Sequence, residues 1–182
     1  MVFEGGFVRV FRRHFPILLM KYFASVFTLS VFALVVKADT VIPIHSLESG
    51  QAVLGTITAK DTDYGLLLLY ALKGLPSGLH GVHVHENPSC DLKGKAAGGH
   101  FDPDKKDKHQ GPYDKSGHKG DLPVLYVNQD GVASTPVLAP RLKEKDLKGR
   151  SLIIHEKGDN YSDTPQKLGG GVSRIACGVV PE

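Results

Sequence analysis

Short apolar segments alternate with clusters of turn residues from residue 39 onward, a pattern typical of β-strands joined by loops. The segments expected to form strands are 40–46, 51–60, 64–72, 78–86, 122–138, 151–157 and 173–180. Helical periodicity is weak in this part of the chain, and only 141–149 is expected to form a turn or two of helix. The pattern therefore predicts an all-β sandwich or barrel.

One turn and two long loops are visible in the same pattern. Asp130 and Gly131, between two apolar runs, predict a β-hairpin. The first long loop (87–123) and the second long loop (157–171) are rich in Gly, Pro, Asp and Lys. Structureless loops of this length in a compact domain are usually functional or disordered, and three histidines in the first loop favour function.

The first forty residues differ from the rest. A basic stretch, VRVFRRHF, precedes an apolar one that ends in Val36, Lys37 and Ala38. This order is typical of a secretory signal peptide cut at Ala38/Asp39, so we expect a leader (1–38) and one mature domain (39–182). An uncleaved membrane anchor is the alternative, although Lys21 divides the apolar run. Met20 offers a second start, which leaves either Met1 or Met20 as the first residue.

Removal of the leader changes the charge of the protein. The whole chain has 22 basic and 19 acidic residues, and the part after residue 38 keeps 17 and 18, a net charge of −1. The basic character belongs to the leader. We therefore expect no nucleic-acid partner, and no membrane partner after signal cleavage.

Export also bears on the only two cysteines, Cys90 and Cys177. In an oxidising compartment such a pair is more often a disulfide than two free thiols. A disulfide that closes a loop of this length would stabilise the domain by roughly 4 to 5 kcal/mol in the chain-entropy model.

His83 and His85 alternate with valines in an apolar run. On a strand the two imidazoles project from one face, about 6 to 7 Å apart, which suits a shared metal ion. Other potential ligands fall in the two loops or at strand ends near them: His100, His109, His118, Asp121 and His155. Histidines scattered for solubility would not concentrate in this way, and imidazole is a ligand for zinc and copper.

The motifs that carry these residues resemble those of bacterial exported Cu/Zn superoxide dismutases. They are LHGVHVHENPSC, AGGHFDP, SGHKGDLP, GRSLIIHEKGDN and GGGVSRIACGVV, in the family's order. The resemblance implies a Greek-key β-barrel or sandwich of about eight antiparallel strands with two long functional loops. It also implies a periplasmic enzyme with one copper and one zinc per subunit that converts superoxide to dioxygen and hydrogen peroxide.

Carried over residue by residue, the resemblance assigns copper to His83, His85, His100 and His155, and zinc to His100, His109, His118 and Asp121. His100 would bridge the two ions, and zinc would be structural. Three His nitrogens and one carboxylate also suit a closed tetrahedral zinc site on chemical grounds alone.

The resemblance implies further roles around the metals. Asp159 would orient one ligand of each metal. His80 would support a strand that carries copper ligands. Arg174 would stand over copper and hold the anionic substrate, with its position fixed partly by the Cys90–Cys177 disulfide. Lys167 would be a second steering cation. Lys105, Lys106 and Lys108 are further candidates, although three neighbouring aspartates largely cancel their charge.

In the implied reaction, copper cycles between Cu(II) and Cu(I), and His100 leaves copper on reduction and carries a proton to the forming peroxide. One rival is an exported metal carrier, which would need neither Arg174 nor a bridging His100. A zinc hydrolase is a weaker rival, because the candidate bases Glu86 and Glu156 are expected to face away from the histidines. The resemblance leaves monomer and homodimer open.

Overall fold

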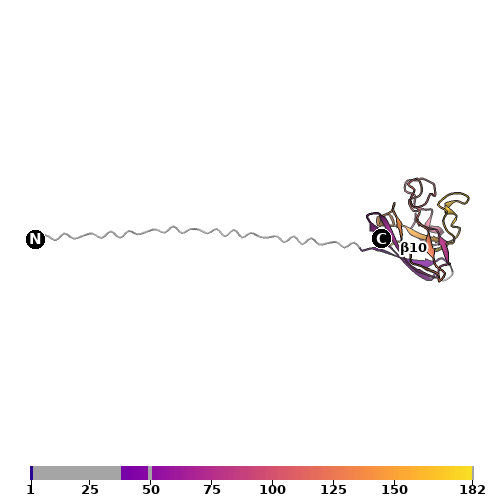
Figure 1. The fold of residues 1–182 in the computed structure, drawn as a ribbon, viewed down its shortest axis with the longest axis horizontal. Coiled ribbons are helices and arrows are strands. Elements are labelled where there is room, and N and C mark those ends of the chain that lie inside the picture. Colours follow the sequence, from indigo (N-terminus) through magenta and orange to yellow (C-terminus); the bar gives the residue numbers. More distant parts are fainter. Residues whose placement is uncertain (2–37, 49–50, 182) are drawn as a thin grey trace. The chain divides into compact units, whose positions relative to one another are not determined.

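The computed structural model describes Met1 and residues 38–48 and 51–181 of the chain. Residues 2–37 of the predicted leader lie outside these residues, whereas the predicted cleavage site at Ala38/Asp39 lies within them. Within them, helices are too short to cross a bilayer. Figure 1 shows strands and loops in almost all of the described part, which confirms the predicted all-β fold.

The described residues form ten strands and three short 3-10 turns. The strands are β1 (Thr40–Ser46), β2 (Val53–Thr62), β3 (Gly65–Lys73), β4 (Gly78–His80), β5 (Val82–His85), β6 (Leu125–Val127), β7 (Val132–Ala133), β8 (Val137–Ala139), β9 (Ser151–His155) and β10 (Arg174–Val179). The turns are η1 (Lys95–Ala97), η2 (Glu144–Asp146) and η3 (Leu168–Gly170). Each strand overlaps a predicted segment, although β2, β3 and β8 extend one or two residues past the predicted ends, and η2 lies in the predicted helical stretch.

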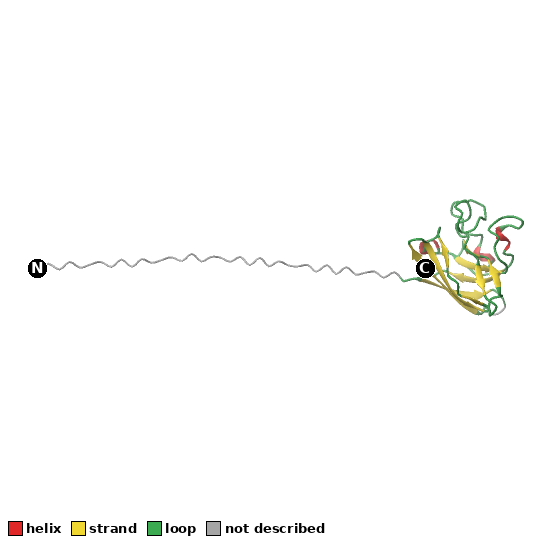
Figure 2. Ribbon diagram, in the orientation of Figure 1, coloured by secondary structure: helices red, strands yellow, loops and turns green. Residues whose placement is uncertain are grey.

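Most strands belong to one curled antiparallel sheet. Its order is β5-β9-β10-β1-β2-β3-β7, and β8 also pairs with β3. The short strands β4 and β6 form a second, two-stranded sheet. The two long loops leave the sheet at one end, where Figure 2 shows them in green beside each other.

The predicted hairpin forms only in part. The turn closes, because Asn128 N–H donates to the Val132 carbonyl at 2.9 Å and Gly131 N–H donates to the Asn128 carbonyl at 3.1 Å. The flanking strands then diverge, since β6 pairs with β4 whereas β7 pairs with β3. The local turn signal is correct, but long-range pairing decides the partners of the strands.

Alternation along the strands separates a core face from an outer face. Val82, Val84, Leu152 and Ile154 belong to the main core, together with Ile42, Ile44, Ile57, Leu66, Leu68 and Leu72. Burial of each such side chain contributes roughly 1.5 to 3 kcal/mol. The alternate residues of β5 and β9 are His83, His85, Ile153 and His155, which are also buried although they face outward from the main core. The long loops therefore cover this outer face.

The first long loop is attached to β5 through its backbone. Val84 N–H donates to the Gly120 carbonyl at 2.9 Å, and Phe101 N–H donates to the Val84 carbonyl at 2.8 Å. A Cβ at Gly120 would lie 2.4 Å from the Val84 oxygen, so only glycine allows this approach. The contact brings the segments that carry His100 and Asp121 against the strand that carries His83 and His85.

The predicted disulfide is present between Cys90 and Cys177, whose Cα atoms are 5.8 Å apart. It joins the first long loop to β10. Ala97, Ile153 and Cys177 form a small second core beneath it, separate from the main core. The disulfide thus fixes the loop segment that precedes His100 against the outer face of the sheet.

Candidate metal centre

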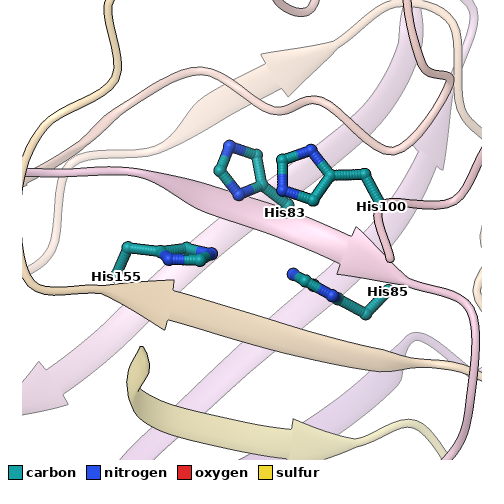
Figure 3. A group of neighbouring side chains, drawn as sticks. All are labelled: His83, His85, His100 and His155. Atoms are coloured by element: carbon teal, nitrogen blue, oxygen red, sulfur yellow. The ribbon is translucent and has the colours of Figure 1, made fainter. Parts of the chain in front are cut away.

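Four histidines form the first potential metal group. His83, His85, His100 and His155 each offer a ring nitrogen, and these atoms all lie within 4.8 Å of one another. In Figure 3 the four rings point toward one common space from β5, β9 and the first long loop. The ring centroids of His83 and His85 are 6.2 Å apart, in agreement with the strand geometry expected from the sequence.

The tautomers of two of these rings are set by their outer partners. His83 Nε2–H donates to Asp159 Oδ2 at 2.7 Å, and His85 Nδ1–H donates to the Gly98 carbonyl at 3.0 Å. The remaining nitrogens, His83 Nδ1 and His85 Nε2, are buried and make no hydrogen bond, as are both ring nitrogens of His155. Buried polar atoms without a partner are costly, and a metal ion would satisfy them.

Burial keeps the rings of this group neutral. The pKa values of His83 and His85 lie well below the usual range, mainly because burial disfavours the charged form, and His100 adds repulsion. Burial, with repulsion from His100 and Arg174, lowers the pKa of His155 to about 3. Neutral imidazoles have the free lone pairs that metal binding needs.

A second group adjoins the first and centres on Asp121. Its members within 4.8 Å are His83, His100, His109 and Asp121. The Nδ1 atoms of His100 and His109 each lie 3.0 Å from Asp121 Oδ1, and His118 Nδ1 lies 3.5 Å from the same oxygen. His118, a predicted zinc ligand, is therefore at the margin of this group.

His83 is shared between the two groups by proximity alone. Its Nε2 is bonded to Asp159, so only Nδ1 can reach an ion, and His85 and His155 lie around the same space. His118 has a buried Nδ1 without a hydrogen bond and faces Asp121. The chemistry of the donors thus favours His118 over His83 as the fourth member of the second group.

The second group carries charge before a metal binds. Burial alone would raise the pKa of Asp121, but His100, His109 and His118 hold it far below its usual value. Burial alone would lower the pKa of His109, but Asp121 and Asp159 raise it to about 9. A carboxylate surrounded by three imidazoles fits Zn²⁺, and the all-imidazole first group fits copper.

Asp159 connects the two groups. One carboxylate oxygen accepts from His83 Nε2, and both lie within 2.9 Å of His109 Nε2. The carboxylate side chain is 1% exposed, so its orientation is fixed by these contacts and by the Tyr161 N–H, which donates to it at 2.7 Å. One side chain therefore orients one ring in each group, as the resemblance implies.

Arg174 lies at the first group but is held from the loop side. Its Nη2 donates to the Gly98 carbonyl at 2.7 Å, and its Nη1 donates to the Gly94 carbonyl. The copper-side hollow, about 400 Å³, is lined by His100, His155, Gln166, Lys167, Leu168, Gly170, Gly171, Val172 and Arg174. The structure thus brings the predicted Arg174 and Lys167 to one cavity with two of the histidines.

His80 supports the end of β9. Its Nδ1 lies 2.7 Å from the His155 carbonyl oxygen, and its Nε2 lies 2.8 Å from the Pro76 carbonyl oxygen. It reaches no metal group among the described residues. Its position matches the supporting role that the resemblance implies.

Glu86 differs from the expectation based on strand alternation. β5 ends at His85, so Glu86 follows the strand, and its Oε2 accepts from the Gly99 N–H at 3.2 Å. The carboxylate therefore lies near His100 instead of on the opposite side. Glu156 is exposed, as expected.

Two positioning residues were missed by the sequence reasoning. Arg141 donates to four carbonyls of the first long loop, those of Gly111, Pro112, Gly117 and His118. Asp163 accepts from the backbone N–H of His109 at 2.9 Å and of Leu168 at 3.1 Å. Nothing in the sequence around Arg141 or Asp163 indicates these contacts, since an arginine after a strand and an aspartate in a loop are usually solvated.

Comparison with known proteins agrees with this geometry. Residues 53–180 match the family profile described as copper/zinc superoxide dismutase. A Cu-Zn superoxide dismutase of Pasteurella multocida is 53% identical over 140 residues, which cover 72% of this chain and 75% of that protein. One of Actinobacillus pleuropneumoniae is 48% identical over 160 residues, 83% of this chain and 82% of that protein.

Solved structures give the same result. The Cu/Zn superoxide dismutase from Brucella abortus superposes with a TM-score of 0.73 at 42% identity, covering 79% of this chain and all of that one. The monomeric copper, zinc superoxide dismutase from Salmonella enterica gives 0.68 at 45% identity with the same coverage of this chain. With the two histidine groups and the fold, these matches show that the chain belongs to the copper/zinc superoxide dismutase family, whose cofactors are copper and zinc.

Proposed function

We propose that the chain is a superoxide dismutase, which converts superoxide to dioxygen and hydrogen peroxide. The observation that carries the proposal is the copper-side hollow, where Arg174 and Lys167 line the same cavity as His100 and His155. A small anion that enters this cavity meets a fixed guanidinium beside the histidine group. Membership of the family supports the same reaction.

The proposed ligands are those that the family resemblance implies. His83, His85, His100 and His155 would hold copper, and His100, His109, His118 and Asp121 would hold zinc. Copper, when bound, supplies one-electron redox chemistry between Cu(II) and Cu(I). Zinc would hold the first long loop in place.

The residues of the chain bind the substrate and handle the proton. The planar guanidinium of Arg174 offers donors to a dioxygen anion, and its bonds to Gly94 and Gly98 keep it in place. His100 Nδ1 faces Asp121, which leaves Nε2 on the side of the first group. His100 Nε2 is therefore the atom at which a proton would be held and delivered to the product.

The rival function is metal carriage on the same scaffold. A carrier needs ligands, but it has no use for a positively charged cavity beside them. The half-buried side chain of Arg174 donates to the Gly98 carbonyl beside the histidine group. This position favours catalysis. A hydrolase is less well supported, because Glu86 is engaged with the Gly99 N–H.

The test is superoxide disproportionation by the protein loaded with one copper and one zinc. We expect fast turnover that falls as salt rises, because salt screens the attraction between the cavity and the anion. Arg174→Gln should lower turnover while both metals stay bound. Stoichiometric metal binding with superoxide decay at the background rate would support the carrier instead.

We further propose that residues 1–38 are a cleaved export signal and that residues 39–182 are the mature periplasmic domain. The pattern of the leader and the disulfide support this proposal. Sequencing of the N-terminus of the protein isolated from the periplasm should begin at Asp39. Recovery of the full-length chain with membranes would favour an anchor.

A further inference from the structure

Two separate hollows reach the metal groups. The copper-side hollow contains Arg174 and Lys167. The zinc-side hollow has a volume of about 230 Å³ and is lined by His100 and His118, together with other residues of the first long loop. Leu168 lines both hollows and so lies between them.

The two hollows carry opposite charge. Arg174 and Lys167 line the copper-side hollow, and no carboxylate does. Glu86, Asp102 and Asp107 line the zinc-side hollow, and Lys105 is the cation there. The sequence alone suggests that the charges of segment 102–108 cancel. In the structure Lys106 and Lys108 do not line this hollow, so a negative balance remains.

The zinc-side hollow opens onto the least enclosed members of the second group. His118 is 7% exposed and His100 is 5% exposed, whereas Asp121 is 1% exposed and His109 is fully buried. An ion that reaches Asp121 from this side must pass His118.

Two buried atoms that make no hydrogen bond belong to residues that line the zinc-side hollow. One is His118 Nδ1, which lies 3.5 Å from Asp121 Oδ1 on a side chain that is only 9% exposed. Asp102 Oδ1 is likewise buried without a partner, while Asp102 Oδ2 accepts from the Asp107 N–H at 2.9 Å. Both atoms are suited to a cation and unsuited to an anion.

We propose that the zinc-side hollow is the inlet for zinc and that Glu86, Asp102 and Asp107 attract the cation into it. Superoxide uses the copper-side hollow, whose charge repels Zn²⁺. The protein thus separates a metal cation from a substrate anion by the sign of the charge at two openings. This inference rests on the proposed function, in which the second group holds zinc. Clefts lined by charge of one sign raise association rates by about 10- to 1000-fold.

The experiment measures the rate of metal uptake by the metal-free, full mature domain. The probe is Co²⁺ in one equivalent, followed by its visible absorption after rapid mixing. Asp107→Asn and Glu86→Gln remove one negative charge each, and Gln keeps an oxygen for the Gly99 N–H. Asp104→Asn is the matched control, because Asp104 is an exposed carboxylate of the same segment that does not line the hollow.

We expect each hollow variant to slow uptake several-fold at low ionic strength, and the double variant to slow it by about tenfold. The difference should disappear in about 1 M salt, where the Debye length is about 3 Å. Lys105→Gln should speed uptake, and Asp104→Asn should leave it unchanged.

Three results would overturn the inference. Equal rates for Asp107→Asn, Glu86→Gln and Asp104→Asn would show that the charge of the hollow does not matter. Slow uptake that persists in high salt would indicate a distorted site. Faster uptake in Lys167→Glu, with no effect at Asp107, would show that the ion enters through the copper-side hollow.

Superoxide decay is measured in parallel on the unaltered protein loaded with both metals. If this protein does not disproportionate superoxide, the proposed function fails, whatever the uptake rates are. If it does and the uptake rates do not depend on Glu86 and Asp107, only the inlet fails. The two hypotheses are therefore separable.

Discussion

The carboxylate of Asp159 determines which ring nitrogen of two different histidines remains free. By accepting the Nε2–H of His83 and contacting Nε2 of His109, it leaves Nδ1 of both rings for metals. A neutral imidazole has one lone pair on nitrogen, so the partner of one nitrogen selects the other as ligand.

Asp159→Asn should therefore weaken metal binding without removing a ligand. An amide can accept through one oxygen only, so one of the two rings loses its anchor. We expect affinity for copper or zinc to fall by about 10- to 100-fold, measured by competition with a chelator. Asp130→Asn, a carboxylate in an exposed turn, is the control, and unchanged affinities in Asp159→Asn would contradict the orienting role.

Asp163 predicts a pH dependence of stability. Its pKa is lowered because the backbone N–H groups of His109 and Leu168 donate to the carboxylate. A depressed pKa means that the stabilisation is complete above the unfolded value of about 4 and is lost as the pH falls through the lower folded value. Compared with Asp163→Asn, the metal-free protein should be about 1 kcal/mol more stable at pH 6, and the difference should vanish once the pH lies below the folded pKa of Asp163.

Urea unfolding at each pH measures this difference. Asp104→Asn, in an exposed position, provides the baseline. A difference between the Asp163 variant and the unaltered protein that is independent of pH would show that packing, and not the ionised carboxylate, is responsible.

The histidines and the aspartate that the structure brings together could be singled out from sequence motifs, whereas Arg141 and Asp163 could not. All of their backbone partners except the Leu168 N–H lie between 23 and 54 residues away along the chain. Backbone atoms carry no sequence signal. Glu86 was placed on the wrong side because the strand ends one residue earlier than the alternating pattern suggests.

At the scale of elements, a single arginine after β8 holds much of the first long loop. Arg141 donates to four carbonyls between Gly111 and His118, a segment without regular structure. Arg141→Met keeps the aliphatic stem and removes the donors. We expect zinc affinity to fall about tenfold or more, because unpaired buried carbonyls cost about 1 to 3 kcal/mol each.

The copper group provides the internal control for this variant. The hydrogen bonds of Arg141 go to carbonyls of the first long loop and not to His83, His85 or His155, so copper affinity should change less than zinc affinity. Equal loss of both metals would indicate general unfolding of the loops.

The disulfide acts on β10 and on the loop that holds Arg174. Cys90 and Cys177 connect this loop to β10 across 87 residues, and Arg174 is bonded to Gly94 and Gly98 of the same loop. Replacing both cysteines by serine should cost roughly 2 to 5 kcal/mol of stability and lower turnover more than metal content. Turnover that follows metal content alone would contradict the link to Arg174.

Strand positions were predicted well because they depend on local alternation, but strand partners were not. The turn at Asp130 and Gly131 forms, yet β6 and β7 pair with β4 and β3. The negative balance of the zinc-side hollow also required the fold, since Lys106 and Lys108 follow Lys105 closely in sequence but lie outside the cavity.

At the scale of the whole molecule, β5 is the terminal strand of the large sheet. Its outer side is closed by the first long loop through the isolated bridges His83–Asp121 and His85–His100. Removal of both metals should loosen this cover, which hydrogen exchange at the β5 amides would report as faster exchange. Unchanged protection of Val84 would show that the loop stays in place without metal.

The cover over β5 has a consequence for self-association. An uncovered edge strand presents unpaired N–H and C=O groups that can pair with another chain. Because the same loop bears the predicted zinc ligands and covers the edge of β5, a chain that lacks zinc would also expose an unpaired strand edge, and zinc supply would then govern how readily newly made chains aggregate.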